Sequence, residues 1–268
     1  MVIFWIPAFA GMTFHLDKVF LNYNYYMFLQ KDEKSKFDFI SIKEFLLALL
    51  LMLITTIISF IAVPAFLKKN LFAYKNFFDS HYFGIVIFLL SSAFTLYIIY
   101  YFCCQRKNKS LKEGLFLKMV SNKILLACLL IGIFMPMLSL PIILKFAPSK
   151  FYAMDMVKTK DGLIYLFTCA LFAPVFEEIF YRGFIFPFFQ SKLNSFWAII
   201  ITALFFGLSH FINIGNAYIL LSLFIFYGFV LTLLRYFSNS LISPIITHFI
   251  HNLTLMTSFF IMSKPNLG

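Results

Sequence analysis

Charged side chains are scarce in this chain of 268 residues. Asp, Glu, Lys and Arg together make up 12% of it, whereas 62% is hydrophobic. A typical soluble domain contains about 25% charged residues and about 45–50% apolar residues. A soluble protein of this composition would expose much of its apolar surface to water. The composition therefore excludes a soluble globular domain, and the same apolar excess excludes intrinsic disorder.

Cysteines are also few, and the basic residues do not form a nucleic-acid-binding pattern. Four scattered cysteines do not make the disulfide framework of a small secreted domain. The formal net charge is +11, but the Lys and Arg residues gather in the segments between apolar runs. This distribution is typical of loops that face anionic lipid, and it lacks the interleaved aromatics of a nucleic-acid surface. We expect membrane lipid as a partner and no nucleic acid.

The sequence contains several long apolar runs. A helix needs about 20 apolar residues to cross about 30 Å of hydrocarbon, and the runs here are continuous, unlike the alternating strands of a membrane barrel. We therefore expect an all-α fold, a polytopic transmembrane helical bundle of about seven helices, of which the fifth is short. The predicted spans are Phe45–Leu67, Tyr82–Cys104, Ile124–Phe146, Leu163–Phe189, Ser195–Phe211, Ala217–Tyr236 and Leu241–Met262.

No internal repeat or low-complexity linker divides the apolar part of the chain. Residues 44–268 are expected to form one membrane domain, in which residues 44–161 supply the N-terminal membrane helices and residues 162–268 the C-terminal ones. More Lys and Arg residues flank the N-terminal side of the predicted spans than the opposite side. By the positive-inside rule this predicts a cytoplasmic N-terminus for an integral protein of a bacterial inner membrane.

The first 43 residues have a different character. The apolar run Met1–Met12 is too short to span a membrane and lacks the positive region of a signal peptide. We expect residues 1–43 to form a poorly structured tail, part of which results from an upstream start codon if Met27 is the true first residue.

Acidic residues nearly disappear from the C-terminal part. Between Gly162 and Gly268 the sequence has only Glu177 and Glu178, adjacent to each other in the predicted span FAPVFEEIFYRGFIF. A charge at the centre of a membrane helix costs about 2.5–3.5 kcal/mol on insertion scales, so such residues are paired or functional. Glu178 and Arg182 are one helical turn apart, which predicts an ion pair. Glu177 is rotated by about 100° from Glu178 and stays free for chemistry.

Two more polar pairs interrupt the later spans. Phe206 and His210 lie one turn apart in FFGLSHF, and His248 and Asn252 lie one turn apart in SPIITHFIHN. A single His or Asn in a membrane helix is usually an interhelical hydrogen-bonding residue, and a buried structural network is the alternative interpretation of the whole set. Adjacent carboxylates together with histidines on two other helices favour a chemical site.

These three motifs, in this order, resemble the CAAX protease and bacteriocin-processing family (CPBP or Abi) of intramembrane proteases. That family is marked by EExxxR, FxxxH and HxxxN on successive membrane helices. The resemblance covers roughly residues 162–258, while the N-terminal helices match only as generic spans. It implies an intramembrane endopeptidase whose substrate is a peptide or a membrane protein.

The resemblance also implies roles for individual residues. Glu177 would activate a water for attack on a peptide carbonyl, and His210 would orient that water or carry its proton. His248 and Asn252 would stabilise the oxyanion. Fixed donors of this kind are most effective where bulk water is excluded.

The remaining motif residues would hold the site together. In this interpretation Glu178 pairs with Arg182, and Phe206 supports the site. Glu178 is counted with the catalytic set.

A metal-dependent mechanism stays open at this stage. Glu177, His210 and His248 could ligate Zn²⁺ and leave one position for water. The chain contains no HExxH motif that would decide between the two mechanisms. It also lacks the GxSG run of rhomboid-type serine proteases and the GxGD motif of presenilin-type aspartyl proteases.

Two other classes of function compete with the protease. A proton-coupled transporter would use the Glu and His residues as a relay, but it predicts polar groups along a path and paired broken helices. The first three predicted spans have no ionisable residue at their centres, and no inverted repeat is visible. The third class is a membrane protein that binds a partner and keeps the polar cluster only for stability.

Overall fold

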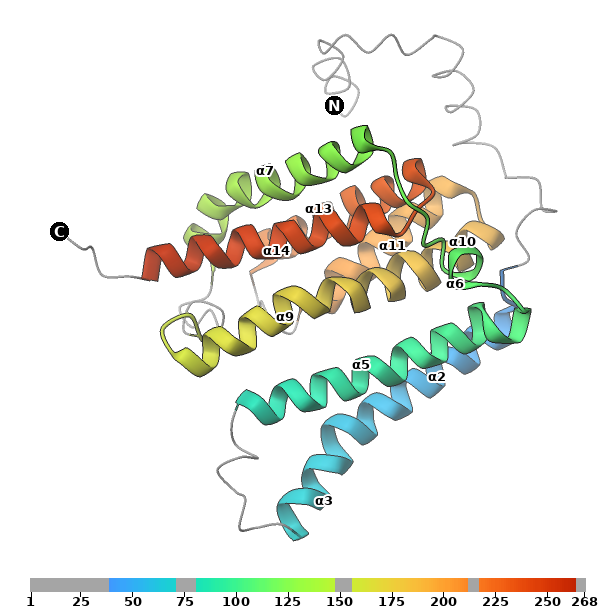
Figure 1. Cartoon of the computed structure of the whole chain (residues 1–268), viewed down its shortest axis with the longest axis horizontal. Helices are drawn as coiled ribbons and strands as arrows, with labels where there is room; N and C mark the ends of the chain where they lie inside the picture. Colours follow the sequence, from blue (N-terminus) through green and yellow to red (C-terminus); the bar gives the residue numbers. More distant parts are fainter. Residues whose placement is uncertain (1–38, 71–80, 148–155, 212–216, 264–268) are drawn as a thin grey trace, which may run out of the picture.

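The protein is helical throughout the part that the structure describes, which comprises residues 39–70, 81–147, 156–211 and 217–263 of a computed structural model (Figure 1). Within these residues there is no strand, and the predicted all-α polytopic bundle is confirmed. Most of the expected N-terminal tail, residues 1–38, lies outside the described residues.

Six helices of the described part are long and apolar enough to cross a membrane, and α11 is a shorter apolar helix. This agrees with the expectation of about seven helices with a short fifth one. The bounds are α2 Ile42–Ile57, η2 Ile58–Ala62, α3 Val63–Asn70, α5 His81–Cys103, η4 Gln105–Lys107, α6 Leu111–Gly114, α7 Asn122–Phe146, α9 Lys160–Glu178, η5 Ile179–Ile185, α10 Phe186–Lys192, α11 Ser195–Ser209, α13 Tyr218–Ser238 and α14 Ile242–Ser263.

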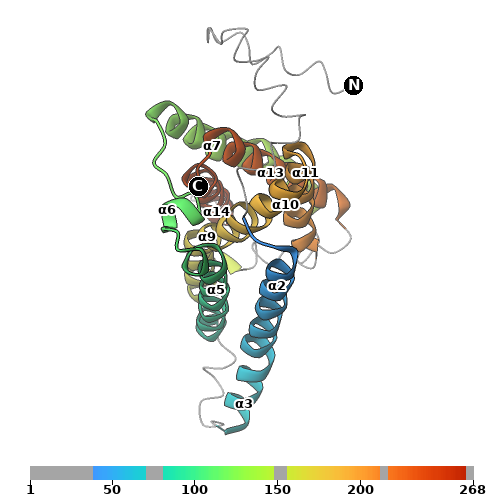
Figure 2. The ribbon, with the colours of Figure 1, turned by 90° about the vertical axis from the view of Figure 1, so that its right-hand side faces the viewer.

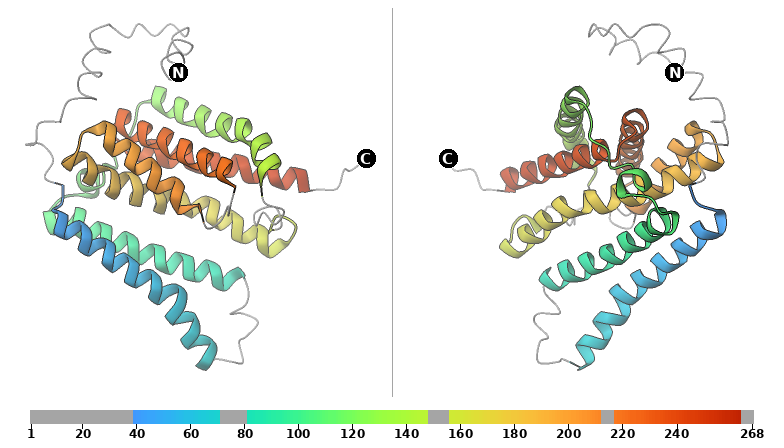
Figure 3. Two further views of the ribbon diagram at one scale, coloured as in Figure 1. Left: turned by 180° about the vertical axis from the view of Figure 1, so that it is seen from behind. Right: turned by 45° about the vertical axis from the view of Figure 1, so that its right-hand side comes forward.

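In Figure 1 α7 lies at the top of the bundle, α14 below it and α9 below α14, while α13 and α11 lie side by side behind α14. Helix α14 packs on both α7 and α9, and α11 packs on α13. The pair α2–α3 and α5 lies on the far side of α9, and α3 diverges from the rest of the bundle (Figures 2 and 3). The C-terminal helices therefore build the compact part of the molecule.

Glycine permits the closest helix contacts. A Cβ atom on Gly207 of α11 would overlap Ile225 Cγ1 and would lie 2.8 Å from the Ile225 backbone nitrogen of α13. A Cβ atom on Gly132 of α7 would lie 2.8 Å from Ile250 Cβ of α14. Small residues at such positions let membrane helices approach each other through their backbones.

The tight turn between α10 and α11 determines how deep His210 lies in the bundle relative to Glu177. Helix α10 ends at Lys192, and α11 begins at Ser195 with the Asn194 side chain accepting a hydrogen bond from the Trp197 N–H at 3.0 Å. Counted from this turn, Glu177 and His210 are equally far along their two helices. The turn therefore brings the glutamate motif and the histidine of α11 to about the same depth.

The loop between α5 and α7 folds back onto the start of α14. Its residues Leu115 and Phe116 are buried in the main core. The Leu241 N–H donates to the Phe116 carbonyl at 3.0 Å, and the Arg235 guanidinium lies 4.3 Å from the centre of the Phe116 ring. These contacts join the loop to the end of α13 and to the start of α14, the helix that carries His248.

Candidate active site

The two glutamates lie where α9 loses its regular geometry. Pro174 has no N–H to donate to the Ala170 carbonyl, so it loosens the turn before them. Directly after Glu178 the helix changes to the π-helix η5. Single π segments within longer helices occur frequently at functional sites. The sequence gave no sign of the π-helix.

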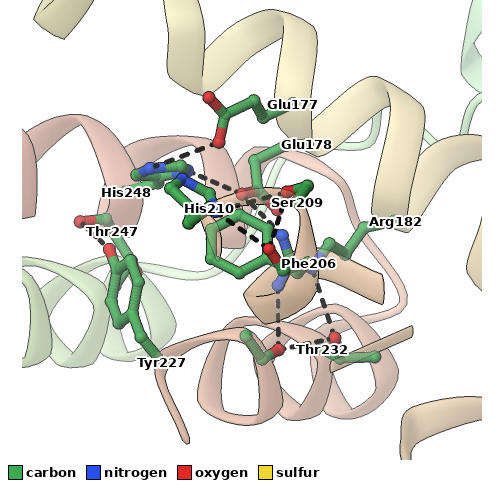
Figure 4. Close-up of polar contacts among 11 residues, drawn as sticks. Glu177, Glu178, Arg182, Phe206, Ser209, His210, Tyr227, Thr232, Thr247 and His248 are labelled. Atoms are coloured by element: carbon green, nitrogen blue, oxygen red, sulfur yellow. Dashed lines mark hydrogen bonds and ion pairs between the residues drawn. The ribbon is translucent and has the colours of Figure 1, made fainter. Parts of the chain in front are cut away.

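Glu178 and Arg182 form the ion pair that their spacing predicted. Arg182 Nη1 donates to Glu178 Oε1 at 2.9 Å, and both side chains are 0% exposed. Arg182 also donates from Nε to Thr232 Oγ1 at 3.2 Å and from Nη2 to the Gly228 carbonyl at 2.8 Å, both on α13 (Figure 4). The centre of the Phe206 ring lies 4.5 Å from the guanidinium carbon. Arg182 thus joins three helices.

His248 shares the oxygen atom that Arg182 binds. Its Nδ1 lies 2.7 Å from Glu178 Oε1, a short hydrogen bond inside the protein. Because the paired carboxylate accepts, Nδ1 is the donor and carries a proton. The other ring nitrogen, Nε2, lies 4.0 Å from Glu177 Oε2. Sequence reasoning placed His248 with Asn252 and missed this contact, which depends on how α14 packs against α9.

Glu177 differs from its neighbour in exposure. Its side chain is 31% exposed, against 0% for Glu178. Glu177 Oε2 is nevertheless buried, and it accepts no hydrogen bond from the residues that the structure describes. The distance of 4.0 Å to His248 Nε2 is too long for a direct hydrogen bond. Two polar atoms at this separation can both bind one water molecule.

Phe206 and His210 lie on the α11 side of the site. The Phe206 ring is 4.9 Å from the His210 ring and 5.8 Å from the His248 ring, measured between centroids. His210 Nδ1 is 2.9 Å from the Phe206 carbonyl oxygen, and the imidazole stacks on Phe224 of α13. Within the described residues, no hydrogen bond joins His210 to either glutamate. The Phe206 ring therefore lies next to both histidines and Arg182.

No hydrogen bond joins Asn252 to the two glutamates or to His248 in the part of the chain that the structure describes. Its Oδ1 lies 3.3 Å from Nδ1 of His251, the next residue before it. The His251 ring stacks on Tyr227 of α13 with 4.0 Å between centroids. The expected shared role of His248 and Asn252 at the oxyanion stays a prediction.

Helix α13 supplies residues that sequence reasoning missed. Tyr227 packs edge-on against the His248 ring at 5.5 Å, and Gly228 and Thr232 accept hydrogen bonds from Arg182. None of these residues carries a charge, so a search for intramembrane charges passes over them. One signal was available in the sequence. The guanidinium of Arg182 has five N–H donors, and a single carboxylate cannot accept all of them, so Arg182 needs further acceptors outside Glu178.

The expected zinc ligands do not come together as a metal site. Among the described residues, no group of three or more His, Cys, Asp or Glu side chains is arranged to hold a metal ion. The Nδ1 contacts of His248 and His210 leave Nε2 of both rings open. The set Glu177, His210 and His248 is nevertheless not gathered around a common point for a Zn²⁺ ion in this geometry.

Comparison with known families agrees with the three motifs. A family model described as type II CAAX prenyl endopeptidase Rce1-like matches residues 159–254, from the start of α9 into α14. The match includes every motif residue from Glu177 to Asn252, and it confirms the family resemblance for this part of the chain. Comparison with curated proteins and with solved structures gives no match. Together with the apolar helices, the family supports an integral membrane protein with protease activity.

Proposed function

We propose that the protein hydrolyses a peptide bond of a substrate that binds between the side chains of Glu177 and His248. The match of residues 159–254 to the model of Rce1-like type II CAAX prenyl endopeptidases supports this proposal. One observation carries this proposal. Glu178 Oε1 binds Arg182 and His248 Nδ1 together, which leaves the second imidazole nitrogen opposite the partly exposed Glu177, 4.0 Å from its Oε2. One carboxylate holds the site, and the other is available for chemistry.

The first step is the activation of water. Two hydrogen bonds of about 2.8 Å, bent at the water oxygen, span the gap between Glu177 Oε2 and His248 Nε2. Glu177 takes a proton from this water as its oxygen attacks the carbonyl carbon of the substrate. The hydrogen bond from His248 Nδ1 to Glu178 fixes the orientation of the ring during the attack.

The second step is the collapse of the tetrahedral intermediate. The second proton of the attacking water passes to His248 Nε2, where the adjacent Glu178 carboxylate stabilises the cation, and this N–H donates a hydrogen bond to the oxyanion. Protonated Glu177 returns its proton to the leaving nitrogen as the C–N bond breaks. After the C–N bond breaks, His248 gives the second proton to the product amine. We assign His210 and Asn252 to contacts with the substrate, since neither side chain contacts the glutamates.

The test uses purified protein in proteoliposomes and a fluorogenic peptide with a farnesylated CAAX terminus, with mass spectrometry of the products. We expect cleavage by the wild type and at least a hundredfold loss in His248→Gln. His81→Gln, a histidine at the start of α5 far from the motifs, should cleave normally.

A proton-flux measurement on the same proteoliposomes tests the transporter alternative. Flux that depends on Glu177, without cleavage of the CAAX peptide or of other membrane peptides, would overturn the proposal in favour of a relay. If the proteoliposomes show neither proton flux nor peptide cleavage, the partner-binding class is favoured.

A further inference from the structure

We propose that Thr232 of α13 is a positioning residue that sets the orientation of His248 through Arg182 and Glu178. The inference deepens the proposed function, because it concerns the imidazole at which hydrolysis is proposed. It assigns a role to a neutral side chain that lies outside the three sequence motifs.

Thr232 holds Arg182 by a pair of shared hydrogen bonds. Its side chain is buried, with 0% exposed, and Oγ1 accepts from Arg182 Nε at 3.2 Å. The same hydroxyl donates to the Gly228 carbonyl at 2.7 Å, and Arg182 Nη2 donates to that carbonyl at 2.8 Å. Because the guanidinium is planar and rigid, fixing Nε and Nη2 also fixes the direction of Nη1.

The direction of Nη1 decides where the Glu178 carboxylate lies. Arg182 Nη1 and His248 Nδ1 both bind Oε1 of Glu178, at 2.9 Å and 2.7 Å. The other oxygen, Oε2, is buried and has no hydrogen-bond partner among the described residues. The orientation of the carboxylate therefore depends on the contacts at Oε1. If Arg182 moves, the Glu178 carboxylate can rotate, and His248 loses the acceptor that fixes its ring.

An ordinary buried threonine provides the comparison. Thr202 of α11 is also 0% exposed, and its hydroxyl donates to the Ala198 carbonyl one turn earlier at 2.7 Å. Thr232 makes the same local bond but in addition accepts from a charged side chain of another helix. A change from Thr to Val removes the hydroxyl at either position with little change in shape, so the two positions separate positioning from local helix structure.

The experiment compares Thr232→Val, Thr232→Ser and Thr202→Val in detergent. NMR of protein labelled with ¹⁵N-histidine reports the hydrogen-bonded Nδ1 proton of His248, which is assigned by its loss in His248→Gln. We expect this signal in the wild type, in Thr232→Ser and in Thr202→Val, and its loss or large shift in Thr232→Val.

Kinetics with the farnesylated CAAX peptide provide the second readout. In Thr232→Val we expect kcat to fall by about 10-fold to 100-fold, the range typical of residues that orient a functional imidazole through hydrogen bonds, with KM unchanged within twofold. If Thr232→Val does not fold, Thr232→Cys, whose thiol is a weak acceptor, takes its place and should give an intermediate loss.

A folded Thr232→Val, or Thr232→Cys in its place, with an unchanged His248 signal and wild-type kcat would overturn the proposal. So would a loss in Thr202→Val of equal size. If the wild type cleaves no peptide, the proposed function fails. The NMR comparison still decides whether Thr232 orients His248.

Discussion

At the scale of single residues, two adjacent glutamates have opposite environments. Glu178 is fully buried and shares one oxygen between Arg182 and His248, whereas Glu177 is partly exposed. A buried carboxylate with a cationic partner stabilises the structure only while both partners are present. The difference follows from helix geometry, because the residue one turn after Glu178 is Arg182 and the residue one turn after Glu177 is Tyr181.

Glu178→Gln should destabilise the protein. The change leaves a buried guanidinium without its counter-ion, and breaking a buried pair in this way typically costs about 3–5 kcal/mol. We expect a lower yield and a Tm clearly below that of the wild type, measured by thermal unfolding in detergent. An unchanged Tm would show that Thr232 and Gly228 suffice to hold Arg182.

The residue scale also shows what the sequence could predict. The Glu178–Arg182 pair followed from the spacing of two charges in an apolar helix, and the structure contains it. The contact between His248 and Glu178, and the acceptors Gly228 and Thr232, join different helices. Such contacts depend on how the helices are rotated against each other, which a single sequence without pairing information does not specify.

At the scale of helices, glycines set how closely α7 and α14 approach. The site depends on this packing because α14 carries His248 next to Thr247, whose carbonyl oxygen would lie 2.9 Å from a Cβ atom on Gly132. The apolar runs predicted these helices and most of their approximate bounds. The two π-helices could not be predicted, since no residue pattern distinguishes a wide turn from a regular one.

Gly132→Ala should therefore push α14 away from α7. Overpacking of a tight contact costs about 1–3 kcal/mol, so we expect a lower Tm and reduced peptide cleavage. The control is Gly84→Ala in α5, where the added Cβ would meet only Tyr165 at 3.5 Å, an ordinary contact. Alanine there should be neutral or stabilise by up to about 1 kcal/mol. Equal Tm values for the two variants would contradict the assigned packing.

At the scale of the whole molecule, the chain is a helical membrane protein whose compact C-terminal part contains residues 159–254, which match the family model. We propose that the ends of α10 and α5 face the cytoplasm of a bacterial cell, because basic residues are concentrated on that side of the bundle. In this orientation the loop that contacts the start of α14 lies at the cytoplasmic surface.

The orientation can be measured at the two ends of one continuous helical segment, α9 to α10. Lys160→Cys and Lys192→Cys place a thiol at either end, and both lysines are exposed. A membrane-impermeant maleimide should label Lys160→Cys in intact spheroplasts and Lys192→Cys only after permeabilisation. The opposite labelling pattern would reverse the proposed topology.

The central claim is that Glu177 is the general base, and Glu177→Gln tests it most directly. An amide cannot accept the proton of the attacking water, and Glu177 has no cationic partner one turn away whose charge it must balance. Glu113→Gln, in the short helix α6 outside the site, is the matched control. We expect Glu177→Gln to keep the wild-type Tm and to lose cleavage of the farnesylated CAAX peptide, while Glu113→Gln cleaves normally. A folded Glu177→Gln with near-normal turnover would contradict the account.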